Sequence, residues 1–501
     1  MLPFENDSGQ ANLDWIGEAV PELINRRLAS AGMMPISRDD RLYAFDHLGL
    51  PQTFQPSRAS AIRLAQTLDA DALIVGSFST SGQRFDLTAQ ILNMATLHMS
   101  APLREETGIS DLLEAVNTLA WQLTRQLDPN IRVSLKTFVA ADSNLQVNAF
   151  ESYIRGLIAP GTPERLDRLK ESLRLDPNYA PAIFALGMAY FSDQQYDPAA
   201  TTFGRLPADD PNAREADFYR GLSYLYTGAY EKAEDAFAFV SKQLPLPEVV
   251  NDEGVAASRR GQDGSALFRQ AAAADPTDAD YQFNLAVSLK RKNDTAGAMD
   301  AITEALKLRP QDQEAQAFAA SLRNHPMHPP PSAASNAAPQ GDDAAPLERV
   351  KRTFNEAAFR QAALELEELD AQRLSALPAP EHAERLTEEG TRFLYQGLIL
   401  EAEREFQAAL AIDPQNANAH AGLAAVRERG GDAAGARDEA THSLALHPNI
   451  TAYLVLAQLD LAAGQLPAAA GSVSHALAIE PQNSAARELR QQLEAKGQQI
   501  P

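Results

Sequence analysis

The sequence predicts an α+β multidomain chain, in which an N-terminal α/β domain is followed by two all-α arrays of paired helices. Two observations support this fold class. A proline recurs about every 34 residues from Pro177 to Pro310, and again from Pro414 to Pro481. A fixed period of this length is the signature of a solenoid, in which each helix pair buries its apolar face against its neighbours. The segment 1–130 lacks the period and alternates strand-like and helix-like stretches.

Apolar patterning within residues 1–130 predicts a mixed sheet with helices. Residues 71–78 are mostly apolar, as in a buried strand, whereas residues 84–93 alternate apolar and polar side chains as a half-exposed strand does. Two shorter extended stretches are predicted at residues 2–4 and 33–37. Apolar residues at helical spacing predict helices over residues 13–30, 57–68 and 109–127.

Several motifs in this segment match a known domain. They are Leu2-Pro3-Phe4-Glu5-Asn6, Trp15-Ile16-Gly17-Glu18, Ile74-Val75-Gly76-Ser77-Phe78 and the run 87–92. With them, the segment 1–127 resembles the N-terminal domain of TolB and its relatives. In such relatives further apolar residues precede the first strand. The resemblance therefore implies work in the bacterial cell envelope after export by a segment missing upstream, and the alternative is a cytoplasmic protein that begins at Met1.

Each repeat unit follows a second pattern besides its proline. Counting the proline as position 32, the unit that begins at Ala180 has Gly187 at position 8, Ala199 at position 20 and Phe203 at position 24. Small residues at positions 8 and 20 let the two helices of a unit approach closely, and the proline ends the second helix because it lacks a backbone N–H. This pattern resembles the tetratricopeptide repeat. The resemblance implies a protein–protein interaction module.

A tract rich in proline, alanine and serine divides the repeats. We expect a first array over residues 141–323, a linker over residues 324–346 and a second array over residues 347–496. The second array is expected to begin with a divergent helix pair at residues 349–377 and to end with a capping helix at residues 484–496. His325 and His328 lie in the linker without a carboxylate or cysteine partner, so we predict no metal site there.

The tetratricopeptide resemblance also implies a partner-binding groove, lined by positions 2, 5, 9, 12 and 13 of the first helix in each unit. In the first array these positions hold apolar and aromatic residues and two cations. Such a groove suits an extended or helical peptide. The alternative is that the N-terminal domain or an adjacent helix covers these aromatic side chains. The predicted groove residues are Phe184, Met188, Phe191, Phe218, Leu222, Leu225, Tyr226, Phe283, Lys290 and Arg291.

Composition narrows the classes of partner and chemistry. The formal net charge is −23 and no basic stripe reverses it, so nucleic acid is a poor candidate partner. Cysteine is absent, which excludes disulfides and thiolate chemistry. No apolar run reaches the length of a membrane-spanning helix. No phosphate-binding loop, nucleophile elbow or metalloprotease motif occurs, so we expect no enzyme activity and no cofactor.

These observations predict a non-enzymatic scaffold or adaptor that binds a protein or peptide partner in the groove of its arrays. The alternative is an accessory or sensor part of a regulatory protein, in signal transduction or transcription, whose output domain is absent from this chain. The identity of the partner and the oligomeric state stay open.

Overall fold

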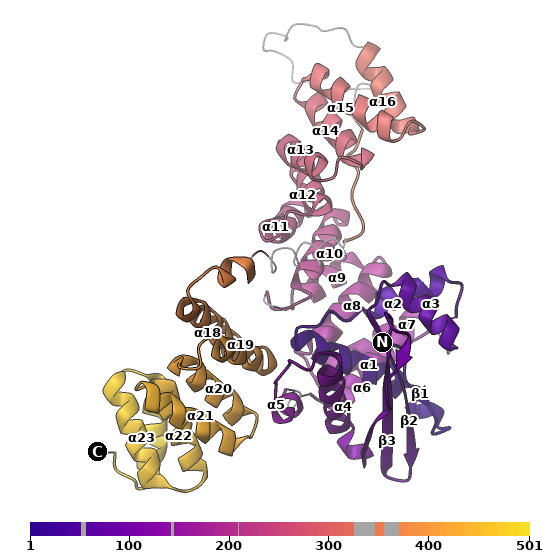
Figure 1. Ribbon diagram of the computed structural model, residues 1–501. Helices are drawn as coiled ribbons and strands as arrows, with labels where there is room; N and C mark the ends of the chain where they lie inside the picture. The colour runs from indigo at the N-terminus through magenta and orange to yellow at the C-terminus, as the bar shows by residue number, and fades with distance from the viewer. Residues whose placement is uncertain are drawn as a thin grey trace. The chain divides into compact units, whose positions relative to one another are not determined.

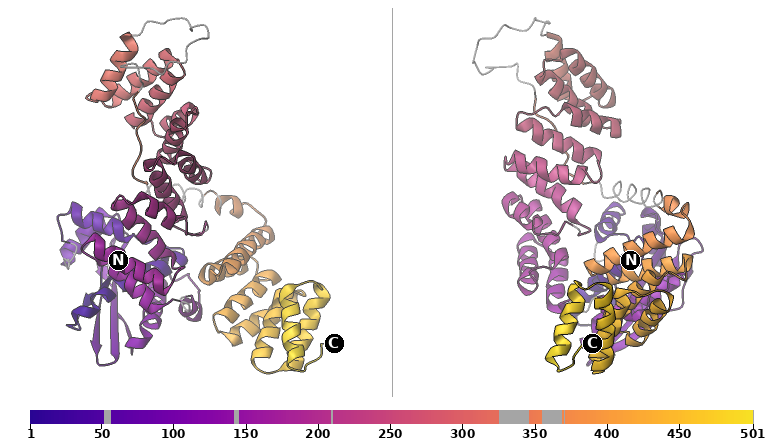
Figure 2. Two further views of the ribbon diagram at one scale, coloured as in Figure 1. Left: turned by 180° about the vertical axis from the view of Figure 1, so that it is seen from behind. Right: turned by 90° about the vertical axis from the view of Figure 1, so that its left-hand side faces the viewer.

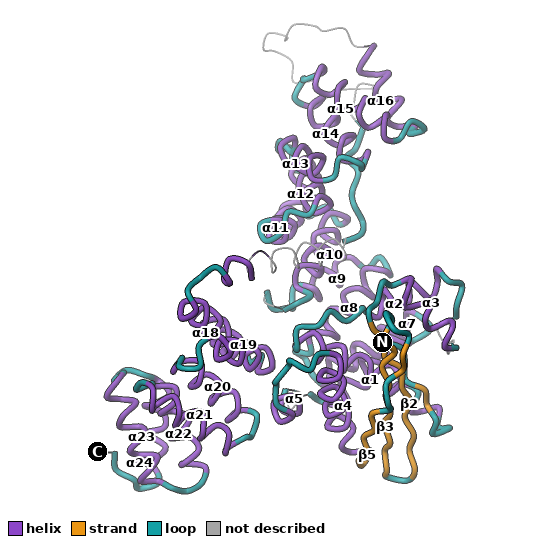
Figure 3. The backbone as a smooth tube through the Cα atoms, viewed as in Figure 1, coloured by secondary structure: helices purple, strands orange, loops and turns teal. Residues whose placement is uncertain are grey.

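A computed structural model describes residues 1–51, 57–141, 145–208, 210–324, 346–354, 369 and 371–500. Within these residues the chain is mostly helical, with one small sheet near the N-terminus (Figures 1 and 3). The predicted α+β multidomain class is confirmed. The chain divides into two compact units, one of Met1–Leu145 with Leu369–Pro501 and the other of Gln146–Glu368. The domain boundaries drawn from the sequence stay predictions.

The sheet of the first unit is built on a long hairpin. Strands β2 and β3 pair along their full length, β1 joins β2 in parallel, and β4 and β5 pair antiparallel with β3. The chain turns between β2 and β3 at Gly82, whose φ of +64° suits glycine. The five strands are β1 (Glu5–Asn6), β2 (Ala72–Ser81), β3 (Arg84–Asn93), β4 (His98–Met99) and β5 (Leu103–Gly108).

Helices cover this sheet. Alternate residues of a strand point to opposite faces, and Leu73 and Leu92 pack with Phe45 of α2 and Leu64 of α3. Helices α1 and α4 contact each other and the strands. The predicted first strand begins later than expected, at Glu5. The four helices are α1 (Trp15–Ser30), α2 (Arg38–His47), α3 (Arg58–Thr67) and α4 (Leu112–Leu127), and the sequence missed α2, β4 and β5.

The second unit is a stack of helix pairs in chain order (Figure 2). Consecutive helices contact each other along the whole stack, and one continuous apolar core runs from α9 to α16. The helices are α6 (Val147–Ile158), α7 (Thr162–Leu175), α8 (Ala180–Ser192), α9 (Tyr196–Phe203), α10 (Ala213–Tyr226), α11 (Tyr230–Ser241), α12 (Pro247–Arg259), α13 (Ser265–Ala274), α14 (Ala279–Arg291), α15 (Thr295–Leu308) and α16 (Gln313–Asn324).

The first unit also contains the second array of helices. Here α5 contacts α19 and α20, where Lys136 Nζ lies 2.7 Å from Asp432 and Ser134 N donates to buried Glu403 at 3.3 Å. At the far end, Leu489 and Leu493 of α24 are buried. The helices are α5 (Leu135–Ala140), α18 (Ala379–Gln396), α19 (Ile399–Ile412), α20 (Ala417–Arg429), α21 (Ala433–Leu446), α22 (Ile450–Ala462), α23 (Leu466–Ile479) and α24 (Ser484–Ala495).

Glycine and phenylalanine explain the close helix contacts in both arrays. A Cβ added at Gly187, Gly221 or Gly390 would overlap the ring of Phe203, Phe237 or Phe406, respectively. Each ring is almost fully buried. The small residue that the repeat pattern places at position 8 is therefore required by the ring at position 24.

We expect Gly422→Ala to lower the free energy of unfolding by about 1–3 kcal/mol, because the new methyl group overpacks the site against Phe406. Urea unfolding of the full chain measures this change in the free energy of unfolding. Gly471→Ala is the matched control, since it lies in helix α23 of the same array with nothing within 4 Å of the added Cβ. The control should gain about 0.5–1 kcal/mol from helix propensity. Equal effects of the two substitutions would contradict the packing argument.

Candidate functional site: an extended segment docked on the first array

A short segment of the chain lies across the first helices of successive pairs in the second unit. We call residues 346–354 the docked segment, and the surface formed by α10, α12, α14 and the start of α16 the A face. The docked segment has no helix or strand. Its first residues contact α14 and α12, and its last residue, Phe354, contacts Phe218 of α10. It therefore runs opposite to the order of the repeats (Figure 1).

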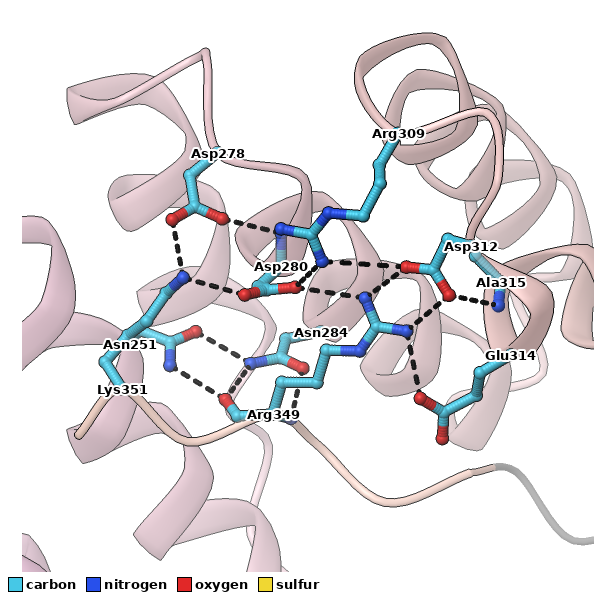
Figure 4. A network of polar contacts seen from close by, with 10 residues as sticks. All are labelled: Asn251, Asp278, Asp280, Asn284, Arg309, Asp312, Glu314, Ala315, Arg349 and Lys351. Carbon is cyan, nitrogen blue, oxygen red and sulfur yellow. Dashed lines mark hydrogen bonds and ion pairs between the residues drawn. The ribbon is translucent and has the colours of Figure 1, made fainter.

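Two asparagines hold the main chain of the docked segment. Asn284 Nδ2 donates to the carbonyl oxygen of Arg349 at 2.7 Å, and Asn284 Oδ1 accepts from the amide of Arg349 at 2.7 Å. Asn251 Nδ2 donates to the same carbonyl at 3.1 Å (Figure 4). Both asparagines are fully buried and lie one repeat apart, in α12 and α14. Because both main-chain groups of one residue are bonded, the register of the docked segment is fixed.

Next to the asparagines, the carboxylate of Asp252 takes a further main-chain group. Its Oδ1 accepts from the amide of Lys351 at 2.9 Å and from Asn251 Nδ2 at 2.9 Å. Burial raises the pKa of Asp252 well above its ordinary value, although these hydrogen bonds oppose the shift. The main chain at residues 349 and 351 is thus held by side chains of α12 and α14.

The side chain of Arg349 is surrounded by carboxylates (Figure 4). Its two terminal nitrogens bond both oxygens of Asp312, at 2.6 and 2.9 Å, and also reach Asp280 at 3.0 Å and Glu314 at 2.9 Å. Its guanidinium carbon lies 3.7 Å from the ring centroid of Phe283. Paired hydrogen bonds between arginine and a carboxylate combine energy with a defined geometry. This site therefore selects an arginine.

Lys351 occupies a second acidic site beside the first. Its ammonium lies 2.5 Å from Asp278 and 2.8 Å from Asp280, and 4.9 Å from the ring centroid of Tyr281. Burial alone would raise the pKa of Asp280, but hydrogen bonds and charges from Lys351, Arg309 and Arg349 outweigh it and lower the pKa to about 2. Burial opposes the charge on Lys351, yet its bonds to Asp278 and Asp280 raise its pKa.

The charge pattern reverses at the residue before Arg349. The side chain of Glu348 is fully buried and bonds Ser258 and Arg291, and Arg259 Nε lies 3.4 Å from its second oxygen. A buried carboxylate is tolerated because cations and a hydroxyl surround it. The A face thus offers cations to residue 348 and carboxylates to residues 349 and 351.

The far end of the docked segment is aromatic. Phe354 is 6% exposed, and its ring centroid lies 5.5 Å from that of Phe218. Beside it, burial raises the pKa of the Tyr226 hydroxyl, while the nearby Arg352 guanidinium opposes this shift. The last residue of the docked segment is therefore held by an apolar contact, whereas the residues before it are held by polar groups.

The predicted groove residues divide into two sets. Four of them lie against the docked segment, and they are Phe218, Tyr226, Phe283 and Arg291. Leu222 and Leu225 are buried in the core, whereas Phe184, Met188 and Phe191 are half-buried against it and Lys290 is half-buried in α14. Other helices of the array contact both rings, since Phe237 lies against Phe218 and Phe318 against Phe283. The docked segment adds Phe354 and Arg349 to these contacts. The binding role of all ten residues stays a prediction.

The expected helix pair at residues 349–377 is wrong at its start. Residues 349–354 form no helix, because the asparagines and Asp252 take the main-chain groups that a helix would use. Residues 355–368 of that pair, and almost all of the expected linker with His325 and His328, lie outside the described residues. Sequence reasoning also missed the two asparagines, although their spacing of one repeat was a signal that could have found them.

Helix pairs stacked in chain order define a helical-repeat protein. The tetratricopeptide repeat family matches residues 184–238, 255–313 and 387–450. Both arrays are therefore built from tetratricopeptide repeats, a fold that typically serves as a non-enzymatic protein-binding scaffold. The likeness of the segment 1–127 to TolB relatives stays a prediction. A comparison with curated proteins finds no match.

Solved structures with similar helices include three repeat proteins. MamA (residues 41 to the end) from Desulfovibrio magneticus RS-1 is 26% identical, with 32% of this chain and 92% of that chain covered and a TM-score of 0.29. YrrB, described as a tetratricopeptide protein with an unusual peptide-binding site, is 18% identical over 35% and 94% of the chains, with a TM-score of 0.32. A complex of yeast Sti1 with an Hsp90 peptide is 14% identical over 64% and 100%, with a TM-score of 0.22.

Two properties of the described residues concern membranes and metals. None of the helices among them has the length and apolar character needed to cross a membrane. The same residues contain no group of three or more histidine, aspartate or glutamate side chains placed to hold a metal ion. The acidic side chains of the A face are instead engaged with Arg349, Lys351 and Arg309.

Proposed function

We propose that the chain is a non-enzymatic scaffold that holds an extended peptide of a partner protein on the A face of its first array. The observation that carries this proposal is the docked segment, which occupies the A face in an extended conformation. Its main chain is bonded by Asn251, Asn284 and Asp252. Main-chain hydrogen bonds supply affinity for an extended peptide, and pockets for its side chains supply specificity.

Three further expectations about the role of the protein are supported by the sequence only. The cell-envelope location rests on the TolB resemblance of the segment 1–127, on its short first strand and on the absence of cysteine, and it stays a prediction. The alternative role, as an accessory part of a regulatory protein, also stays a prediction, and no contact among the described residues favours it. The expectation that nucleic acid is not a partner rests on the net charge of −23.

A synthetic peptide tests the proposal directly. The probe is fluorescein-labelled PLERVKRTF, the sequence of residues 346–354. The protein is the full chain carrying Arg349→Ala and Lys351→Ala, which we call the opened chain, because its own docked segment has lost its two principal charges. We expect saturable binding in a fluorescence anisotropy titration.

Two further substitutions show where the peptide binds. Asn284→Ala removes main-chain recognition and Asp312→Ala removes the paired contact to arginine, so each should weaken binding by about tenfold or more when added to the opened chain. Arg174→Ala is the control, because Arg174 pairs with neighbouring Glu171 on the exposed side of α7. A folded opened chain that does not bind the probe would overturn the proposed function.

A further inference from the structure

The docked segment has the burial pattern of a bound peptide. Only Glu348 and Phe354 are buried among its residues, while Leu347 is 62% exposed. The side chains of Arg349 and Lys351 remain 18% exposed. Phe354 belongs to the apolar core of the array and Val350 packs against it, whereas Glu348, Arg349 and Lys351 are held by charge pairs. Departure of the docked segment would leave the stacked pairs in contact with each other.

The charges of the A face also define an order of residues. The cations Arg259 and Arg291 meet residue 348, and the carboxylates meet residues 349 and 351. An extended peptide with the opposite order would place like charges together, which costs affinity and excludes wrong partners. The buried ring of Phe354, five residues after Arg349, adds a requirement for an aromatic side chain.

We propose that the docked segment is a built-in competitor for the partner peptide, and that the partner carries the same order of side chains in an extended stretch. That order is an acidic residue, an arginine, any residue, a lysine and then an aromatic residue three positions further. This inference rests on the proposed function. It adds the chemistry of the partner and a regulatory step, in which the partner must displace a segment of the same chain.

The docked segment competes strongly for the A face because it belongs to the same chain. A segment tethered to its own binding face acts at an effective concentration of about 1 mM. If the free peptide binds with a Kd of about 10 μM, the intact chain should bind it about 100-fold more weakly than the opened chain does. A partner with more contacts than the docked segment would still displace it.

The experiment compares the intact chain, the opened chain and the Arg174→Ala control by fluorescence anisotropy. The probes are PLERVKRTF, the charge-reversed peptide PLEEVERTF and the shifted peptide PLERKVRTF, in which the lysine directly follows the arginine. We expect PLERVKRTF to bind the opened chain about 100-fold more tightly than the intact chain or the control. The reversed and shifted peptides should bind the opened chain at least tenfold more weakly than PLERVKRTF.

Each outcome bears on a separate statement. Equal affinity of PLERVKRTF for the intact and opened chains would overturn the competitor while the proposed function stands. Equal affinity of the three peptides for the opened chain would overturn the order of side chains. Absence of binding to every protein would overturn the proposed function itself. The intact chain could instead form a concentration-dependent dimer that PLERVKRTF dissociates. That result would show that a second copy of this chain occupies the A face, and it would overturn the proposal that the partner is another protein.

Because the paired substitutions that open the chain can perturb folding, a second opened variant is included. Phe354→Ala leaves both charges and removes the aromatic contact to Phe218. It should also bind PLERVKRTF more tightly than the intact chain. Far-UV circular dichroism of both variants verifies that the helices are present.

Discussion

Replacing Arg349 with alanine is expected to release the docked segment from the A face. The substitution removes the paired hydrogen bonds to Asp312 and the contact to Asp280, which keeps Lys351 and Arg309 as partners. Removing one partner of a buried ion pair costs about 3–5 kcal/mol. Since the side chain of Arg349 is 18% exposed and water screens part of the interaction, we expect about 2–4 kcal/mol. That lowers the equilibrium constant for docking by about 30- to 700-fold.

The absence of cysteine offers a direct measurement of this release. Thr353→Cys gives a single labelling site on an exposed residue at the end of the docked segment. A nitroxide label there should give an immobilised spectrum in the otherwise unchanged chain and a mobile spectrum after Arg349→Ala. Arg174→Ala removes an arginine of another exposed ion pair and should leave the label immobilised. An immobilised label in the Arg349→Ala chain would contradict the role given to this side chain.

Acid should release the docked segment as well. The pKa of Asp280 is lowered to about 2, and the hydrogen bond from Arg349 lowers the pKa of Asp312. A carboxylate whose pKa falls on docking stabilises the docked state above its free pKa, near 4. This stabilisation is lost as the pH falls from about 4 through about 2. For Asp280 it amounts to less than about 2 kcal/mol, because Arg309 of the array contributes part of the pKa shift and stays after release.

The same nitroxide label follows the acid release. The label should be immobilised from pH 7 to pH 5 and become mobile between about pH 4 and pH 2. Burial raises the pKa of Asp252, so its protonation favours the docked state and acts against the release. Far-UV circular dichroism on the same samples separates release from unfolding. Release at the same pH in an Asp280→Asn chain would show that other groups control it.

The repeats could be predicted from the sequence because their determinants are local. Gly187 and Phe203 lie within one helix pair and recur at the same positions in later pairs, so one contact repeats along the chain. The hairpin of β2 and β3 was predictable for the same reason, since its strands adjoin in sequence. Strand β5 was missed because its mixed charged and polar residues carry no clear alternation of apolar side chains.

The docked segment could not be predicted in this way. Its contacts join Arg349 to Asn251 and Asn284, which are 98 and 65 residues away in sequence. No periodicity connects them. The pattern of apolar residues after residue 349 favoured a helix, and the main-chain bonds to the asparagines override that local preference. The aromatic residues of the A face could be predicted from their repeat positions. The acidic site around Arg349 could not, because it depends on which segment of the chain lies over the A face.

The docked segment also bears on the mechanics of the array. A solenoid is flexible along its length, because each helix pair contacts only its neighbours and small rotations between pairs add up along the stack. The docked segment packs against α10 and hydrogen-bonds to α12, α14 and α16 within a single short stretch, so it resists changes in the spacing of four successive pairs at once. An array without it would be more compliant. Exchange of the occupant would then alter the elasticity of the array, and a pulling force along the stack would work directly against peptide binding.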